Sequence, residues 1–229
     1  MTVIDFGRPV GASHPPFIIS SLDCRDLRNL ERALSAIDAA ADSAVDAIKL
    51  AHMPWAWSAR LFARADDRGV ILLATALDES AVTRLDWLGA PALYMVHDWS
   101  DLELVAHAAR TGKPIVMQIG TASHIELAEV IETVHQNGTG GIALVQSVID
   151  VELEGLDELV LHSQVCGISD RSNGVEIPLA AILRGASIVE KRFTLCDDNM
   201  LCPIELSAVV RDCEQAWASQ GTDRRWVTN

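Results

Sequence analysis

The sequence has few basic residues. Its 229 residues include 18 Lys and Arg against 32 Asp and Glu, which gives a formal net charge of −14. A protein that binds the phosphate backbone of nucleic acid needs a positive surface, and no basic run supplies one here. We therefore expect no nucleic-acid partner.

Long apolar runs are also missing. None approaches the roughly 18 uncharged residues that a membrane-spanning helix requires. The first residues, MTVIDFGRPVG, carry an acid early and lack the apolar core of a secretory signal. The sequence thus predicts a cytoplasmic protein with no membrane partner.

Paired cysteine motifs and glycine-rich nucleotide motifs do not occur. The five cysteines form no C-x-x-C pair and stand at Cys24, Cys166, Cys196, Cys202 and Cys213. Their odd number and irregular spacing favour reduced thiols over a disulfide framework or a metal site. Neither a dinucleotide fingerprint nor a P-loop is present, so we expect no cofactor.

What the sequence does contain is an alternation of short apolar, β-branched runs with amphipathic segments. The expected strands cover 17–22, 44–51, 69–77, 92–97, 113–120, 141–148, 163–169 and 186–193. The helices that follow them are expected at about 27–41, 56–67, 79–88, 100–110, 123–136, 154–162, 174–184 and 203–219. Such alternation implies a parallel sheet with helical crossovers, and eight units predict a (β/α)8 TIM barrel. We expect an N-terminal extension over 1–16, the barrel over 17–219 and a C-terminal tail over 220–229.

Polar side chains gather at the expected C-terminal ends of the strands, where such barrels place their chemistry. Because strand side chains alternate, Glu190 and Arg192 share one face of the last strand and Lys191 takes the other. Ser169 and Arg171 share a face of the strand before it. Other polar residues lie late on further strands: Lys49, Thr75, Gln118 and Gln146. Together these side chains predict a site at one rim of the barrel.

The segment GISDRSNGVEIPLAAILRGASIVEKRFTL, residues 167–195, resembles a pattern of the sialic acid synthases close to GYSDHTxGxxxxLAAxxxGAxxIEKHFTL. These enzymes condense phosphoenolpyruvate with an N-acylated amino sugar. Four other segments are similar to further family motifs in the same order: GASHPPFIIS, AVDAIKL, TALDESAVTRLDWLGAPALY and TGKPIVMQIG. The likeness runs from about residue 10 to residue 216. It implies the barrel of that family and a role in carbohydrate acid biosynthesis.

The resemblance also carries over individual site residues. Lys49 matches a family lysine, Thr75 and Asp78 match a TPFD motif, Ser169 and Asp170 match SD, and Glu190 and Lys191 match EK. In the family, the matching regions form a pocket for phosphoenolpyruvate and the sugar, and the resemblance implies such a pocket here. We predict Lys49 and Glu190 as catalytic residues. The predicted ligand-binding residues are Thr75, Asp78, Gln118, Ser169, Asp170, Arg171 and Arg192.

The departures from the family pattern are concentrated in the same region. The family holds a divalent metal through two histidines, and Arg171 and Arg192 stand at those positions. Ser21, Tyr94 and Gln118 replace a family glutamate, lysine and serine. The acidic loop after the last strand and the C-terminal antifreeze-like domain are not found in this sequence.

The two arginines change the expected ligand. A protonated guanidinium has no free lone pair for a cation, but it binds carboxylate or phosphate bidentately. We therefore expect no metal in the barrel mouth and an anionic small molecule as the partner.

Three interpretations stay open at this point. The first is a metal-free synthase or lyase in which arginines stabilise an oxyanion and Lys49 is a Schiff-base nucleophile or a charge partner. The second is a binding or regulatory barrel that has lost turnover, because Ser21 and Tyr94 lack the family's functional groups. The third is an internal ion-pair network that only fills the barrel. The substrate, the pathway and whether the chain forms a homo-oligomer also stay open.

Overall fold

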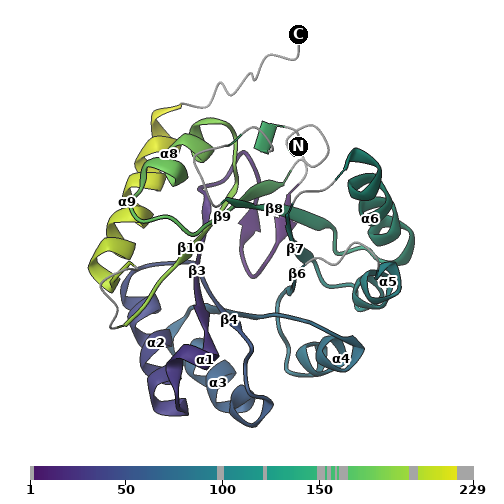
Figure 1. Cartoon of the computed structure of the whole chain (residues 1–229), viewed down its shortest axis with the longest axis horizontal. Helices are drawn as coiled ribbons and strands as arrows, with labels where there is room; N and C mark the ends of the chain where they lie inside the picture. The colour runs from purple at the N-terminus through teal and green to yellow at the C-terminus, as the bar shows by residue number, and fades with distance from the viewer. Residues whose placement is uncertain are drawn as a thin grey trace.

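The computed structural model describes residues 3–96, 101–120, 123–148, 153, 156–157, 159, 165–195 and 201–220. Eight parallel strands form a nearly closed barrel, with the helices on the outside (Figure 1). The strands are β3 (Phe17–Asp23), β4 (Ala47–Ala51), β5 (Ile71–Ala74), β6 (Leu93–Val96), β7 (Ile115–Ile119), β8 (Ile142–Val148), β9 (Cys166–Asp170) and β10 (Ile188–Arg192). This arrangement confirms the predicted TIM barrel.

The strand order shows how the barrel closes. The hydrogen-bonded order is β5-β4-β3-β10-β9-β8-β7-β6, so the first and last strands of the barrel, β3 and β10, are neighbours. An isolated bridge between Thr75 and Tyr94 joins the two remaining edges, and the Ala76 amide donates to the Tyr94 carbonyl at 2.8 Å. Closure brings the C-terminal ends of all eight strands to one rim.

The helices follow the strands as the sequence predicts. They are α1 (Cys24–Leu27), α2 (Leu30–Asp42), α3 (Ser58–Arg68) after the 3-10 turn η1 (Trp55–Trp57), α4 (Glu79–Trp87), α5 (Leu102–Arg110), α6 (His124–Asn137), α8 (Glu176–Leu183) and α9 (Pro203–Ser219). Several helices begin at an N-cap residue whose side chain accepts a hydrogen bond from an amide of the first turn. Ser123 does so at the start of α6, in a capping box with Glu126. The helix expected at 154–162 falls mostly outside the described residues. In the part of the chain that the structure describes, no helix is both long and apolar enough to span a bilayer.

Alternating side chains divide the core into two layers. On β3, Phe17 and Ile19 point into the barrel, whereas Ile18 and Leu22 pack against the helices. The barrel interior is apolar near the N-terminal ends of the strands and carries buried polar groups near their C-terminal ends. Burial of each large apolar side chain contributes roughly 1.5–3 kcal/mol, so both layers stabilise the position of the strand ends.

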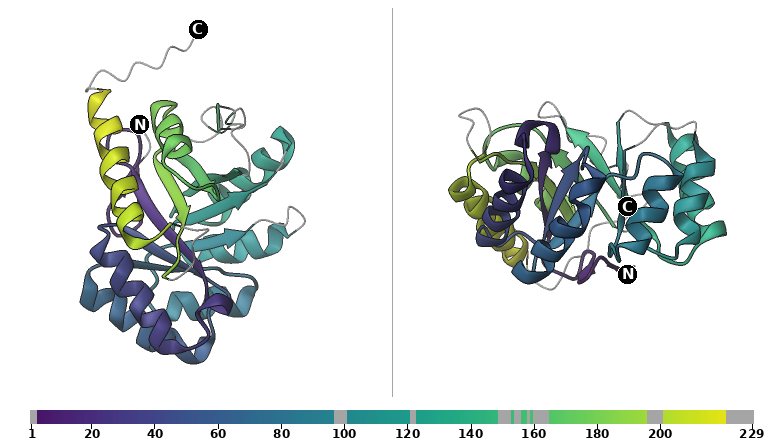
Figure 2. Two further views of the ribbon diagram at one scale, coloured as in Figure 1. Left: turned by 60° about the vertical axis from the view of Figure 1, so that its left-hand side comes forward. Right: turned by 90° about the horizontal axis from the view of Figure 1, so that it is seen from below.

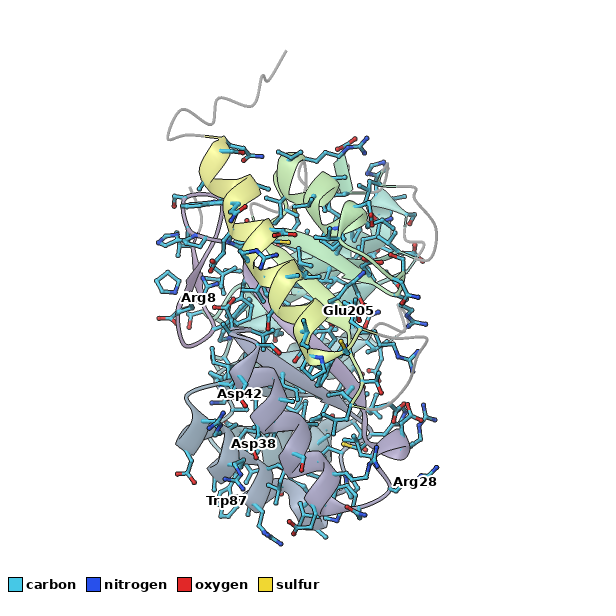
Figure 3. The ribbon with its side chains drawn as sticks, turned by 90° about the vertical axis from the view of Figure 1, so that its left-hand side faces the viewer. Arg8, Arg28, Asp38, Asp42, Trp87 and Glu205 are labelled. Carbon is cyan, nitrogen blue, oxygen red and sulfur yellow. The ribbon has the colours of Figure 1, made fainter. Side chains whose placement is uncertain are left out.

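The residues before the barrel form a small antiparallel pair, β1 (Ile4–Asp5) and β2 (Pro9–Val10). Phe6 is fully buried, and its ring meets the Phe17 ring edge to face at a centroid distance of 5.5 Å. Figure 2 shows the N-terminal segment beside the barrel in two further views, and Figure 3 places Arg8 and Arg28 on opposite sides of the molecule. The segment predicted as an extension therefore packs into the base of the barrel.

Candidate functional site at the barrel mouth

A cavity of about 290 Å³ opens at the C-terminal ends of the strands, and we call it the mouth pocket. Ser21, Asp23 and His52 contribute to its wall. Eight of the nine predicted site residues also line it: Lys49, Thr75, Gln118, Ser169, Asp170, Arg171, Glu190 and Arg192. The strand parity inferred from the sequence thus brings most of them together, while their roles remain predictions.

The floor of the mouth pocket is a buried ion pair. Lys49 Nζ lies 2.5 Å from Glu190 Oε1, and the two side chains are 6% and 4% exposed. The Ser169 hydroxyl donates to the same carboxylate oxygen at 3.0 Å, and the Tyr94 hydroxyl donates to Glu190 Oε2. Both oxygens of Glu190 therefore have donors within the barrel, as a buried carboxylate requires.

Tyr94 was predicted only as a departure from the family pattern, yet it fills the centre of the barrel. Lys49 Nζ lies 4.2 Å from the centre of its ring, and Gln118 Oε1 lies 3.2 Å from its hydroxyl. Burial raises the pKa of the Tyr94 phenol well above its usual value of 10.0, and the charge and hydrogen bond of Glu190 raise it further. The charge of Arg171 acts in the opposite direction. The sequence did contain a signal for Tyr94, because it lies within the apolar strand ALYMV at a position that points into the barrel.

The two arginines lie at the rim and differ in their partners. Arg192 Nη2 lies 3.7 Å from Asp26 Oδ2, and the two side chains are 46% and 66% exposed. Arg171 is exposed and forms no ion pair with any described residue. Both arginines, Lys49 and Glu190 line the mouth pocket together. Glu190 pairs with Lys49 and Asp26 approaches Arg192, whereas Arg171 is the one of these three cations that has no ion-pair partner among the described residues.

Asp170 lines the mouth pocket, but its carboxylate is bonded on the helix side of the sheet. Its carboxylate pairs with Lys191, and both side chains are fully buried on the helix side of the sheet. Asp170 Oδ1 also accepts from the Ser172 amide at 2.8 Å, while Lys191 donates to the Ser172 carbonyl at 2.7 Å. These bonds engage the carboxylate of Asp170 and orient the loop after β9, while the role of Asp170 as a ligand contact stays a prediction.

Two other polar residues named from the sequence, Asp78 and Gln146, do not line the mouth pocket. Asp78 does not line the mouth pocket, since it caps α4, where its Oδ1 accepts from the Ala81 amide at 2.7 Å. Gln146 shares a face of β8 with Ile142 and Leu144, which pack toward the helices, and so points away from the barrel interior. The TPFD match for Asp78 and the strand position of Gln146 located these residues in the sequence but did not determine the direction of their side chains.

The structure also adds a cluster that sequence reasoning missed. Asp23 Oδ2 lies 3.1 Å from His52 Nδ1, and Asp23 Oδ1 accepts from the Arg25 amide at 2.9 Å. Burial raises the pKa of Asp23, but the hydrogen bonds from Arg25 and the nearby positive charges outweigh it and hold that pKa below 3.8. His52 adopts a positive φ of 51°, which is uncommon for a residue with a side chain. No sequence motif signals this cluster, because its members follow different strands.

The rim residues do not fit a divalent metal. Arg171 and Arg192 stand where the resembled pattern has histidines, and a guanidinium offers no lone pair to a cation. Among the described residues, no group of three His, Cys, Asp or Glu side chains is placed to hold a metal ion. The donor chemistry of this rim thus suits an anion rather than a cation.

Comparison with known proteins adds independent information. A model of the NeuB family matches residues 26–225. The pseudaminic acid synthase of Helicobacter pylori is 30% identical over 155 residues, which cover 63% of this chain and 45% of that protein. The spore coat polysaccharide biosynthesis protein SpsE of Bacillus subtilis is 25% identical over 236 residues, covering 84% of this chain and 63% of that protein. This chain therefore spans about half to two thirds of the length of these curated relatives.

A solved structure agrees on the fold. The N-acetylneuraminic acid synthetase of Leptospira borgpetersenii, crystallised with citrate, superposes with a TM-score of 0.89 at 24% identity. The alignment covers 98% of this chain and 92% of that one. At this identity the superposition supports the barrel architecture alone.

Proposed function

Because the chain belongs to the NeuB family, we propose that its mouth pocket binds an anionic small molecule of carbohydrate acid biosynthesis. The observation that carries this proposal is Arg171, which lines the pocket and has no ion-pair partner within the described chain. The adjacent Lys49–Glu190 pair is already neutral as a unit, so Arg171 gives the rim a net positive charge. A planar guanidinium binds phosphate or carboxylate through two parallel hydrogen bonds.

Two other groups are available to the same ligand. Thr75 Oγ1 is buried and lacks a hydrogen-bond partner among the described residues, although the residue lines the pocket. Arg192 contacts Asp26 only at 3.7 Å, a distance at which an exposed ion pair contributes little. An anion at the rim would use both groups without breaking the buried Lys49–Glu190 pair.

The proposed chemistry is the metal-independent formation or cleavage of a carbon–carbon bond. Arg171 and Arg192 would stabilise the negative charge that develops on an oxygen of the substrate. Lys49 and Glu190 would then act from the floor of the pocket as a hydrogen-bonded pair, since each is already in contact with the other.

Ligand binding without turnover is the second candidate, and a specific observation favours it. Both Glu190 oxygens already accept hydrogen bonds, and Lys49 lies between that carboxylate and the Tyr94 ring. A free base or nucleophile is thus not exposed on this floor, which suits a pocket that only holds its ligand.

Calorimetric titration tests the binding proposal. Phosphate, sulfate, phosphoenolpyruvate and pyruvate would each be titrated into the wild type and into Arg171→Ala. Loss of one charge-assisted contact should weaken binding by about 10- to 100-fold. The control is Arg211→Ala, which removes an exposed guanidinium from α9 and should bind normally. If no anion binds the wild type, or Arg171→Ala binds equally well, the rim is an internal ion-pair network instead.

Turnover separates the two candidates. Phosphoenolpyruvate would be incubated with N-acylated amino sugars in the presence of a strong chelator, and released phosphate measured. Product formation that disappears in Arg171→Ala supports metal-independent synthesis. Binding without any product supports the non-catalytic barrel.

A further inference from the structure

A second cavity, of about 510 Å³, adjoins the mouth pocket. Arg25, Arg28 and Arg32 line it on one side, and Phe193 and Thr194 line it on another. We call it the arginine pocket. It shares Leu22, Asp23 and Arg25 with the lining of the mouth pocket. One ligand could therefore reach both.

The carboxylates of the arginine pocket already have cations. Asp23 Oδ2 lies 2.5 Å from Arg25 Nη2, and Asp26 Oδ2 lies 3.7 Å from Arg192 Nη2. Neither acid pairs with Arg28 or Arg32. Within the described part of the chain, these two arginines form no ion pair at all. Two guanidinium groups thus line one cavity without an ion-pair partner among the described residues, in a protein whose formal net charge is −14.

Arg32 gives an independent observation that points to an anion. Its Nε is buried and finds no hydrogen-bond acceptor among the described residues. A buried donor without an acceptor loses its hydration and gains nothing in return. An oxyanion in the arginine pocket would supply the acceptor.

The position of Arg28 and Arg32 beside a helix N-terminus is also unfavourable for their charges. Arg28 immediately precedes Asn29, the N-cap of α2, and Arg32 lies in the first turn of that helix. The amides of a helix N-terminus carry partial positive charge, so cations are disfavoured there and anions favoured. A bound anion would reverse the unfavourable interaction for both side chains.

We propose that the arginine pocket binds a phosphate monoester group of the ligand. Two uncompensated guanidiniums match a phosphate dianion better than a carboxylate, which carries one charge. Since the pockets share a wall, the phosphate belongs to the molecule whose other anionic group contacts Arg171. The ligand is then a sugar derivative with two anionic groups. This ligand assignment rests on the proposed function of the mouth pocket, whereas phosphate binding by Arg28 and Arg32 does not.

Titration with inorganic phosphate tests the arginine pocket by itself. We expect two sites in the wild type, of which Arg171→Ala loses one and Arg28→Ala loses the other. Arg28 is exposed, so its removal should not disturb folding; Arg32→Ala should weaken the same site by about 10- to 100-fold. Arg211→Ala serves as the control and should keep both sites. A wild type with one site that only Arg171→Ala removes would overturn the arginine pocket and leave the mouth pocket standing. A single site removed only by Arg28→Ala would do the reverse.

A ligand with both groups tests the connection between the pockets. Phosphogluconate carries a phosphate and a carboxylate on one sugar chain, and gluconate carries the carboxylate alone. In the wild type, phosphogluconate should bind at least tenfold more tightly than either phosphate or gluconate, because the second contact is intramolecular. Arg28→Ala and Arg171→Ala should each abolish that advantage. If phosphogluconate binds no better than phosphate, the two pockets do not serve one ligand.

Discussion

At the residue scale, Glu190 is the centre of the buried polar cluster. Its carboxylate accepts from Lys49, Ser169 and Tyr94, which come from three other strands of the barrel. A charge buried this deeply is tolerated only while its partner is present. The floor of the mouth pocket and the stability of the barrel therefore depend on the same pair.

We expect Glu190→Gln to lower the free energy of unfolding by about 3–5 kcal/mol, because it leaves the Lys49 ammonium buried without its carboxylate. The double variant Lys49→Met with Glu190→Gln should lose less, since no unpaired charge remains. Urea unfolding of both proteins measures the difference. Equal losses in the single and double variants would show that the two side chains do not act as a pair.

Tyr94 provides a spectroscopic test of the same cluster, because it is the single tyrosine of the chain. Burial and Glu190 raise its pKa well above 10.0, so the folded state keeps a proton that the unfolded state releases. The stability contributed by Tyr94 is thus fully present below pH 10.0 and decreases as the pH rises above it. We expect phenolate absorbance to appear only together with loss of helical circular dichroism. Urea-unfolded protein is the control, and a folded protein that titrates like it would contradict the burial of Tyr94.

The sequence predicted which side chains share a face better than it predicted their partners. Period-two alternation is local, so Glu190 and Ser169 were placed in the interior correctly. The partners of Lys49 and Asp170 depend on which strands meet when the barrel closes, and that order is not local. Arg171 and Arg192 illustrate the limit, because both end a strand and, among the described residues, only Arg192 has an ion-pair partner.

At the scale of elements, the β1–β2 pair shows what strand patterns can miss. Residues 1–16 were predicted as an extension that precedes the first barrel strand. Ile4, Phe6 and Val10 are nevertheless buried in the barrel base, and Arg8 donates to the Pro16 carbonyl at 2.8 Å and pairs with Asp46. The alternation around GRP was the only signal, and two-residue strands are too short to establish a period. The eight barrel strands, in contrast, were predicted because each run extends over several residues.

We expect Phe6→Ala to destabilise the protein by about 3–5 kcal/mol, since it opens a cavity beside Phe17 in the barrel base. Val3→Ala is the matched control, because its side chain is 45% exposed and its removal should change stability by no more than about 0.5 kcal/mol. Thermal and urea unfolding would measure both. A Phe6 variant as stable as the Val3 variant would mean that the pair is not part of the core.

At the scale of the whole molecule, the net charge of −14 acts against the compact state and against the approach of any anion. Sodium chloride should raise the thermal midpoint modestly by screening that repulsion. Phosphate at the same ionic strength should raise it further, because it also binds the native state. At one hundred times its dissociation constant, a bound ligand contributes about 2.7 kcal/mol. For a chain of this length that corresponds to about 5–10 °C.

Phosphate also stabilises proteins without binding, because it is excluded from their surfaces and strengthens apolar burial. The double variant Arg28→Ala with Arg171→Ala separates the two effects. It lacks one guanidinium of each pocket, both without an ion-pair partner among the described residues, yet it keeps the overall acidity and the buried Lys49–Glu190 pair. We expect it to retain the response to chloride and the exclusion effect of phosphate, and to lose the remainder of the phosphate response. Identical phosphate responses in the wild type and the double variant would show that the positive rim binds no anion.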